Sequence, residues 1–96
     1  MHVVIAYDVA TNSREGRRRL RRIARTCKDF GQRVQFSVFE CSLNLTHWTK
    51  LKHRLLQEMN KEEDSLRLYF LSTDDVTKTE HYGVREPRDL DEPLVI

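Results

Sequence analysis

The chain has 96 residues, of which 33% are charged and 39% hydrophobic, a balance typical of one folded, soluble domain. No apolar run approaches the roughly 20 residues that a membrane-spanning helix needs, and residues 1–3 do not begin a signal peptide, so we expect a cytoplasmic protein. The net charge of +2 hides an asymmetry, because residues 1–48 carry nine basic and four acidic side chains, whereas residues 49–96 carry eight and eleven. This asymmetry predicts one face for a polyanion and another for a basic partner or for solvent.

The first expected element is a strand that ends on a carboxylate. Residues 3–7 (Val-Val-Ile-Ala-Tyr) form an apolar run typical of a strand buried on both faces, and Asp8 follows it directly. Functional groups often collect at the carboxyl ends of such strands. Asn12 or Ser13 is placed to cap the next helix, so capping does not account for Asp8. Asp8 is therefore the first candidate for a functional residue.

A helix is expected from about Arg14 to Asp29, ended by Gly31 in the left-handed conformation. Its apolar stripe contains Cys27, which we expect, like Cys41, to be a buried free thiol. Residues 14–28 contain eight basic side chains and one acidic one. Such a surface repels itself unless a polyanion neutralises it, so we predict a nucleic-acid-binding face; a solvated basic face is the alternative. The predicted contacts are Arg14, Arg17, Arg18, Arg21, Arg22 and Arg25.

The next segment, residues 33–43, is strand-like. Val34, Phe36 and Val38 share one parity, which predicts that they lie on the covered face of a sheet. Periodicity leaves open whether the segment is one long strand or a tight hairpin that turns near Ser37. A second helix is expected from Thr46 to about Asn60, with Leu56 among its buried side chains, followed by a solvated acidic loop over residues 61–64 and a strand over 65–71.

The C-terminal part is more irregular. We expect a turn at Asp74 and Asp75, a short strand over 80–84, an acidic connector over 87–93, and a final strand over 94–96 that pairs with the edge of its own or a partner's sheet. The order of elements predicts an α+β sandwich, and a hairpin within 33–43 would make it the ferredoxin-like βαββαβ fold. Residues 1–84 would form the ferredoxin-like domain, and residues 85–96 a linker and strand of that same domain.

Three stretches of the chain resemble the family of small CRISPR-associated proteins called Cas2. They are residues 4–9 (Val-Ile-Ala-Tyr-Asp-Val), 31–41 (Gly-Gln-Arg-Val-Gln-Phe-Ser-Val-Phe-Glu-Cys) and 64–69 (Asp-Ser-Leu-Arg-Leu-Tyr), together with the arginine-rich helix. The Val-Gln-x-Ser-Val-Phe-Glu run is the most specific of these motifs. The tail at 89–94 (Asp-Leu-Asp-Glu-Pro-Leu) resembles the variety found in type I-C systems.

The resemblance implies a role in CRISPR adaptation, a branch of antiviral defence. It implies a ferredoxin-like homodimer with apposed open sheet faces and an exchanged last strand. Two dimers of the integrase Cas1 would flank it, and the complex would capture duplex DNA and insert it as a spacer. It also implies a magnesium-dependent endonuclease, a hydrolase acting on DNA or RNA.

The resemblance also assigns roles to individual residues. Asp8 matches the aspartate taken as the magnesium ligand and catalytic residue, with a structural strand-end aspartate as the alternative. One carboxylate makes a poor Mg²⁺ site, so two copies of Asp8 would have to meet at a dimer axis. Ser37 and Phe39 match positions near the dimer cleft, and Tyr7 is either a site-lining or a core aromatic.

Two rival functions follow from the same residues. One is a non-catalytic architectural adaptor of the spacer integrase, in which Asp8 is structural. The other is an RNA-binding module of the RRM type, which shares the fold class. That module needs a Lys/Arg-Gly-Phe/Tyr pattern, which this sequence lacks.

Overall fold

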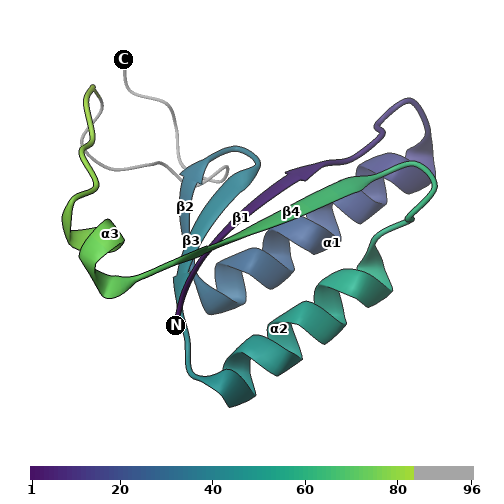
Figure 1. Cartoon of the computed structure of the whole chain (residues 1–96). Helices are drawn as coiled ribbons and strands as arrows, with labels where there is room; N and C mark the ends of the chain where they lie inside the picture. The colour runs from purple at the N-terminus through teal and green to yellow at the C-terminus, as the bar shows by residue number, and fades with distance from the viewer. Residues whose placement is uncertain (84–96) are drawn as a thin grey trace.

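The computed structural model describes residues 1–83, which form a four-stranded sheet with two long helices on one face (Figure 1). The elements are β1 (His2–Asp8), α1 (Arg14–Phe30), β2 (Gln32–Gln35), β3 (Val38–Ser42), α2 (Leu45–Glu58), β4 (Ser65–Leu71) and α3 (Thr73–Thr77). The strand order is β2-β3-β1-β4, and each neighbouring pair is antiparallel. The ferredoxin-like fold is therefore confirmed, and residues 33–43 form the hairpin rather than one long strand.

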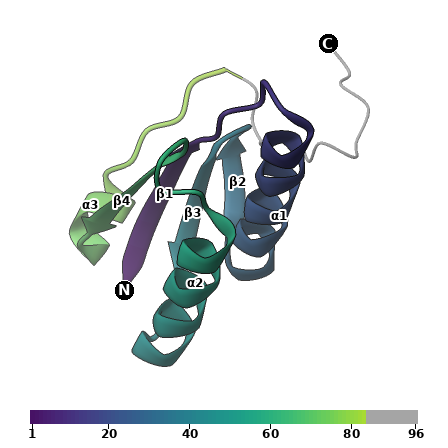
Figure 2. The same cartoon turned by 90° about the vertical axis from the view of Figure 1, so that its right-hand side faces the viewer.

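The two long helices lie side by side across the sheet and leave its other face open (Figure 2). Ser13 caps α1 by accepting a hydrogen bond from the Gly16 amide at 3.0 Å, and Asn44 caps α2 by accepting one from the His47 amide at 2.8 Å. Among the described residues, no helix is both long enough and apolar enough to span a membrane.

The C-terminal predictions have mixed outcomes. The predicted connector at 87–93, the final strand at 94–96 and the tail at 89–94 lie outside the described residues. Residues 80–83 contain no strand, so that prediction is wrong for the part that is described. Asp74 and Asp75 lie in the first turn of the short helix α3, which begins at Thr73, and not in the predicted turn, because Ser72 and Asp75 form a reciprocal capping box.

Strand β1 is buried on one face more completely than on the other. Val3, Ile5 and Tyr7 lie in the core beneath the helices, whereas Val4 and Ala6 on the open face are only half-buried in the single chain. The expectation of complete burial on both faces is therefore met on the helix side alone. Cys27 and Cys41 are buried free thiols, as predicted, and burial raises the pKa of Cys27 to about 12 and of Cys41 to about 11.

The covered face of the β2–β3 hairpin is the opposite of the predicted one. Phe36 is 64% exposed at the turn, whereas Arg33, Phe39 and Cys41 lie beneath the helices. The pairing register of β2 and β3 shifts between Arg33 and Gln35, but odd-numbered residues face the helices in both strands, so the predicted even-numbered set is the wrong one. Leu56, also predicted to be buried, is exposed on α2.

Gly31 is required by close packing rather than by a left-handed conformation. Its φ of −154° and ψ of −167° are extended, so the predicted left-handed cap is wrong. A Cβ at this position would collide with Cys41 Sγ and with the carbonyl oxygen of Glu40. The absence of a side chain therefore lets the end of α1 pass directly over β3.

An acidic residue before β4 is buried, although residues 61–64 were expected to be solvated. The Asp64 side chain is 1% exposed and accepts hydrogen bonds from Arg19 Nε at 2.9 Å, the Asn60 amide at 2.9 Å and the Ala10 amide at 3.2 Å. Burial by itself raises the pKa of this carboxyl, but the hydrogen bonds from Arg19 and the two amides outweigh it and lower the pKa below its ordinary value.

Replacing Gly31 with alanine should destabilise the protein. The added methyl group meets both a side chain and a backbone carbonyl, so we expect a loss of about 1–3 kcal/mol in the free energy of unfolding. Urea denaturation followed by circular dichroism measures it. Ser42→Ala, at an exposed position of β3, is the control. A Gly31→Ala variant as stable as the wild type would contradict the packing account.

The buried Asp64 should make stability depend on acid pH. Because its pKa is lower in the folded than in the unfolded state, its contribution is complete above the unfolded value of about 3.9 and is lost as the pH falls through the lower folded value. We expect the free energy of unfolding to fall more steeply below about pH 4 in the wild type than in Asp64→Asn. Urea denaturation across this pH range measures the difference, with Glu62→Gln, an exposed neighbour, as the control. Parallel pH profiles for the wild type and Asp64→Asn would rule out this role.

Candidate functional site

Asp8 is exposed at the carboxyl end of β1, where the strand leaves the sheet. Side chains alternate along a strand, so Asp8 lies on the open face with Val4 and Ala6, opposite the core face that holds Tyr7. Its pairing partner on β4 is Ser65. The structure thus places a carboxylate at one end of the sheet face that neither α1 nor α2 covers (Figure 2).

An arginine that we did not predict lies close to this carboxylate in the sheet. Arg67 on β4 pairs with Ala6, so it is a diagonal neighbour of Asp8 on the open face. Arg67 Nη1 donates a hydrogen bond to the hydroxyl of Tyr69 at 3.2 Å, and the guanidinium carbon lies 6.0 Å from the centroid of that ring. The signal available in the sequence was a single arginine inside the otherwise apolar run of residues 66–71.

The other candidate residues lie on the opposite side of the sheet or in the turn. Tyr7 is buried, and its hydroxyl donates a hydrogen bond to the carbonyl oxygen of Phe36 at 3.1 Å. Burial raises the pKa of Tyr7 to about 12, so the phenol is neutral at physiological pH. Phe39 is fully buried and stacks on Tyr7 with ring centroids 6.2 Å apart. Ser37 lies in the β2–β3 turn, where its carbonyl oxygen accepts a hydrogen bond from the Tyr7 amide at 3.1 Å.

Arg33 is a buried cation with unusual surroundings. The residue is 6% exposed, and within residues 1–83 none of its three guanidinium nitrogens donates a hydrogen bond. Its guanidinium carbon lies 5.0 Å from the centroid of the Phe39 ring, which is a favourable cation–π contact. Burying such a charge is costly. Nothing in the residue pattern distinguished Arg33 from the polar residues beside it, and its burial was missed.

Within residues 1–83, no group of three or more His, Cys, Asp or Glu side chains is placed to hold a metal ion. In a single chain, Asp8 is therefore not part of a ready-made metal cluster. A carboxylate oxygen is the type of donor that Mg²⁺ prefers, but the ion needs several oxygen ligands. The donor chemistry of Asp8 fits Mg²⁺ only if a second copy of the chain supplies another carboxylate.

All six arginines predicted to bind nucleic acid are exposed on α1. Arg17 Nη1 donates a long hydrogen bond, 3.4 Å, to the carbonyl oxygen of Thr11. Within the described part of the chain, the side chains of the other five form no hydrogen bond or ion pair: Arg14, Arg18, Arg21, Arg22 and Arg25. Arg19 differs, because its side chain is 15% exposed and is bonded to Asp64. These five arginines thus form an exposed basic surface on α1 that no ion pair within residues 1–83 neutralises.

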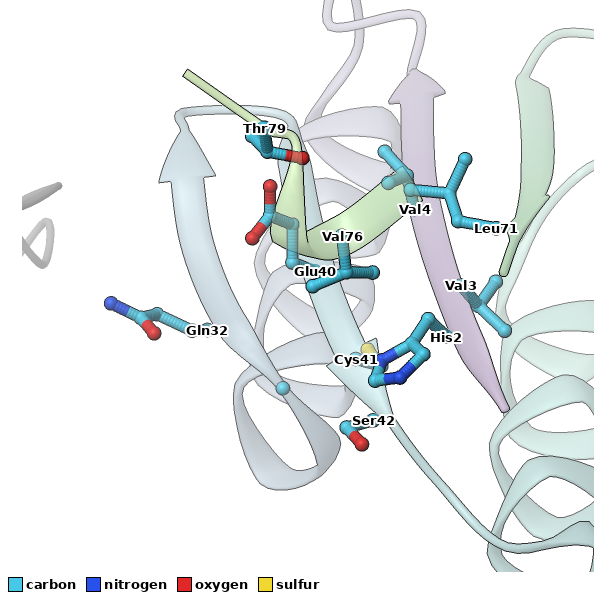
Figure 3. A pocket seen from close by; sticks show the side chains of 11 residues that line it. His2, Val3, Val4, Gln32, Glu40, Cys41, Ser42, Leu71, Val76 and Thr79 are labelled. Atoms are coloured by element: carbon cyan, nitrogen blue, oxygen red, sulfur yellow. The ribbon is translucent and has the colours of Figure 1, made fainter. Parts of the chain in front are cut away.

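A cavity of about 420 Å³ lies at the far end of β1 from Asp8 (Figure 3). Val76 and Thr79 border it on one side, and residues of the open sheet face border it on the other, including His2, Glu40 and Ser42. His2 and Asp8 are the two ends of the same strand. The cavity is therefore separate from the exposed carboxylate.

Comparison with known proteins identifies the family. The family described as CRISPR associated protein Cas2 matches residues 1–79. A Chlorobaculum tepidum protein named CRISPR-associated endoribonuclease Cas2 is 53% identical over 96 residues, which span all of both chains. A protein from Halalkalibacterium halodurans named CRISPR-associated endonuclease Cas2 is 47% identical over 95 residues, 99% of each chain.

A known structure agrees with these sequence relationships. The crystal structure of Streptococcus pyogenes Cas2 superposes with a TM-score of 0.77 at 44% sequence identity, and the match covers 86% of this chain and 100% of that one. The similarity thus extends to the arrangement of the strands and helices. The chain belongs to the Cas2 family of CRISPR-associated proteins.

Proposed function

We propose that the protein is a homodimeric, magnesium-dependent endonuclease of CRISPR adaptation that also binds duplex DNA for spacer integration with Cas1. The observation that carries the proposal is the exposed carboxylate of Asp8 on the open sheet face. The names of its relatives from Chlorobaculum tepidum and Halalkalibacterium halodurans, endoribonuclease and endonuclease, support hydrolysis of a phosphodiester in RNA or DNA.

The open sheet face supports the dimer. It carries Val4, Ala6 and Leu71, which are half-buried in the single chain, and Tyr69, which is 47% exposed. Covering such exposed apolar side chains with a second surface removes them from water and stabilises the association. A two-fold interface is self-complementary and brings a residue near the axis close to its own copy. We infer that the two-fold axis passes near the end of β1, so that apposed open faces would pair the two Asp8 carboxylates.

Paired carboxylates would hold Mg²⁺, with Asp8 of each chain as the protein ligand. The bound ion would lower the pKa of a water molecule and neutralise charge on the phosphate. Asp8 would contribute by fixing the ion at the edge of the open face. Arg67, its diagonal neighbour, would offer a positive charge to the phosphate oxygens.

The arginines of α1 would contact DNA without reading its sequence. Contacts to phosphates fix the position of a duplex but carry no sequence information, which suits the capture of arbitrary spacers. α1 covers the face of the sheet opposite Asp8, so the proposed DNA-binding surface and the proposed metal site are separate (Figure 2). The architectural adaptor remains the second candidate function, because the basic surface could act in it without any chemistry at Asp8.

Replacing Asp8 with asparagine should abolish cleavage and preserve binding. A metal ion stabilises the transition state by several kcal/mol, so we expect a loss of about 100-fold or more in the Mg²⁺-dependent rate. Cleavage of labelled RNA and duplex DNA is measured with Mg²⁺ and with chelator, and duplex binding is measured in parallel. Equal residual cleavage by the wild type and the variant would indicate a contaminant and favour the adaptor.

Reversing the charge of Arg18, Arg22 and Arg25 to glutamate should abolish duplex binding at moderate salt. Each phosphate contact releases counterions, so replacing the same three residues with glutamine should reduce the slope of log affinity against log salt by about 3. Fluorescence anisotropy with a labelled duplex measures both effects. Lys50, Lys52 and Lys61 are exposed elsewhere, and their replacement by glutamate is the control with the same change in net charge. Unchanged binding in the arginine variant would exclude this surface.

A further inference from the structure

The segment that follows Asp8 is held on two sides. The Ala10 amide donates a hydrogen bond to Asp64 Oδ1 at 3.2 Å. The Ala10 carbonyl oxygen lies against Gly16 in the first turn of α1, where any Cβ would collide with it. Ala10 is thus bound through its amide to the loop before β4 and packed through its carbonyl against α1.

Asp64 is itself held by an arginine of the basic helix. Arg19 Nε donates a hydrogen bond to Asp64 Oδ2 at 2.9 Å, and Arg19 Nη2 donates one to Glu63 Oε2 at 2.8 Å. The Asn60 amide donates a further hydrogen bond to Asp64 Oδ2 at 2.9 Å. A buried ion pair with additional hydrogen bonds has a defined geometry, and removing one partner leaves an uncompensated charge.

The same loop reaches Asp8 through the sheet. Asp64 is followed directly by Ser65, whose pairing partner in β1 is Asp8. Ser65, the residue after Asp64, therefore pairs with Asp8 across the strands. The Asp64 side chain binds the amide of Ala10, two residues after Asp8. Strand pairing on one side and a buried carboxylate on the other define where β1 ends.

We propose that Asp64, held by Arg19, is a positioning residue for Asp8. It fixes the backbone on the C-terminal side of Asp8 and thereby limits the orientations that the exposed Asp8 carboxylate can adopt. The inference rests on the proposed metal-binding role of Asp8. Groups that orient a metal ligand typically change metal affinity by 10–100-fold when they are removed.

The proposal also divides the basic residues of α1 by role. Arg19 is directed inward to an acidic pair, whereas the six exposed arginines keep their charges at the surface. Replacing Arg19 should therefore affect the Asp8 end of β1 more than it affects DNA binding. A helix that looks uniformly basic in sequence would thus serve two separate purposes.

The experiment compares Asp64→Asn with a matched control that breaks another ion pair of α1. Arg54 Nη2 donates hydrogen bonds to Asp29 Oδ2 at 3.0 Å and to Thr26 Oγ1 at 3.3 Å, joining α2 to α1 without contacting the segment after Asp8. Mg²⁺ is titrated into each protein while the backbone amides of residues 7–10 are followed by NMR, and hydrogen exchange of the Ala10 amide is measured without metal. Thermal unfolding is recorded for every variant.

We expect Asp64→Asn to raise the Mg²⁺ midpoint about tenfold and to speed exchange at Ala10, whereas Arg54→Gln leaves both unchanged. Arg19→Lys keeps the charge but cannot contact Asp64 and Glu63 through two separate nitrogens, so it should raise the Mg²⁺ midpoint by a smaller factor. Arg19→Lys replaces Asp64→Asn as the test variant if Asp64→Asn does not fold. Wild-type Mg²⁺ midpoints or wild-type Ala10 exchange in the folded variants would overturn the positioning role.

The failure of the underlying function has a different signature. If Asp8→Asn responds to Mg²⁺ as the wild type does, the proposed metal site is wrong. Accelerated Ala10 exchange in Asp64→Asn would then show that Asp64 holds the backbone after Asp8 without positioning a metal ligand. The positioning role would be overturned together with the metal site.

Discussion

The pairing of β1 with two strands at once is the constraint on which the rest of the molecule depends. Because β1 lies between β3 and β4, its backbone groups are satisfied on both edges, and its pleat sends successive side chains to opposite faces. Val3, Ile5 and Tyr7 anchor the two helices, while the alternate positions end in Asp8 on the open face. One face of β1 thus contributes to the core, and the other face carries the candidate site residue Asp8.

Electrostatics divides the molecule in a second way. The outer face of α1 carries five exposed arginines that form no ion pair with a described residue, whereas Arg19 on the same helix is paired with the buried Asp64. The exposed arginines receive little electrostatic stabilisation from the rest of the protein, so a polyanion is the partner that matches their charge. The inward pair joins α1 to the loop before β4, and its stability derives from hydrogen bonds as well as charge.

Much of the fold could be predicted because local patterns were strong. The apolar run of β1, the stripe of α1 and a helix cap at Asn12 or Ser13 are each defined by residues close in sequence, and the structure shows that Ser13 is the cap. The covered face of the β2–β3 hairpin was predicted wrongly, because apolar Phe36 is exposed at the turn whereas the charged Arg33 is buried against the Phe39 ring, so residue polarity indicated the wrong parity. The burial of Asp64 could not be distinguished from the exposure of Glu62 within one acidic run, since its partner Arg19 lies 45 residues away.

The sequence by itself determined the order of β1, α1, α2 and β4, the basic helix and the carboxylate at the end of β1, because these depend on periodicity and charge within short windows. Only the tertiary structure decided which side chains face the helices and which arginine of α1 is withdrawn from the surface. It also decided what holds the backbone beside Asp8. Those features arise from contacts between segments far apart in the chain, where burial and hydrogen-bond geometry, rather than residue type, select the role of each side chain.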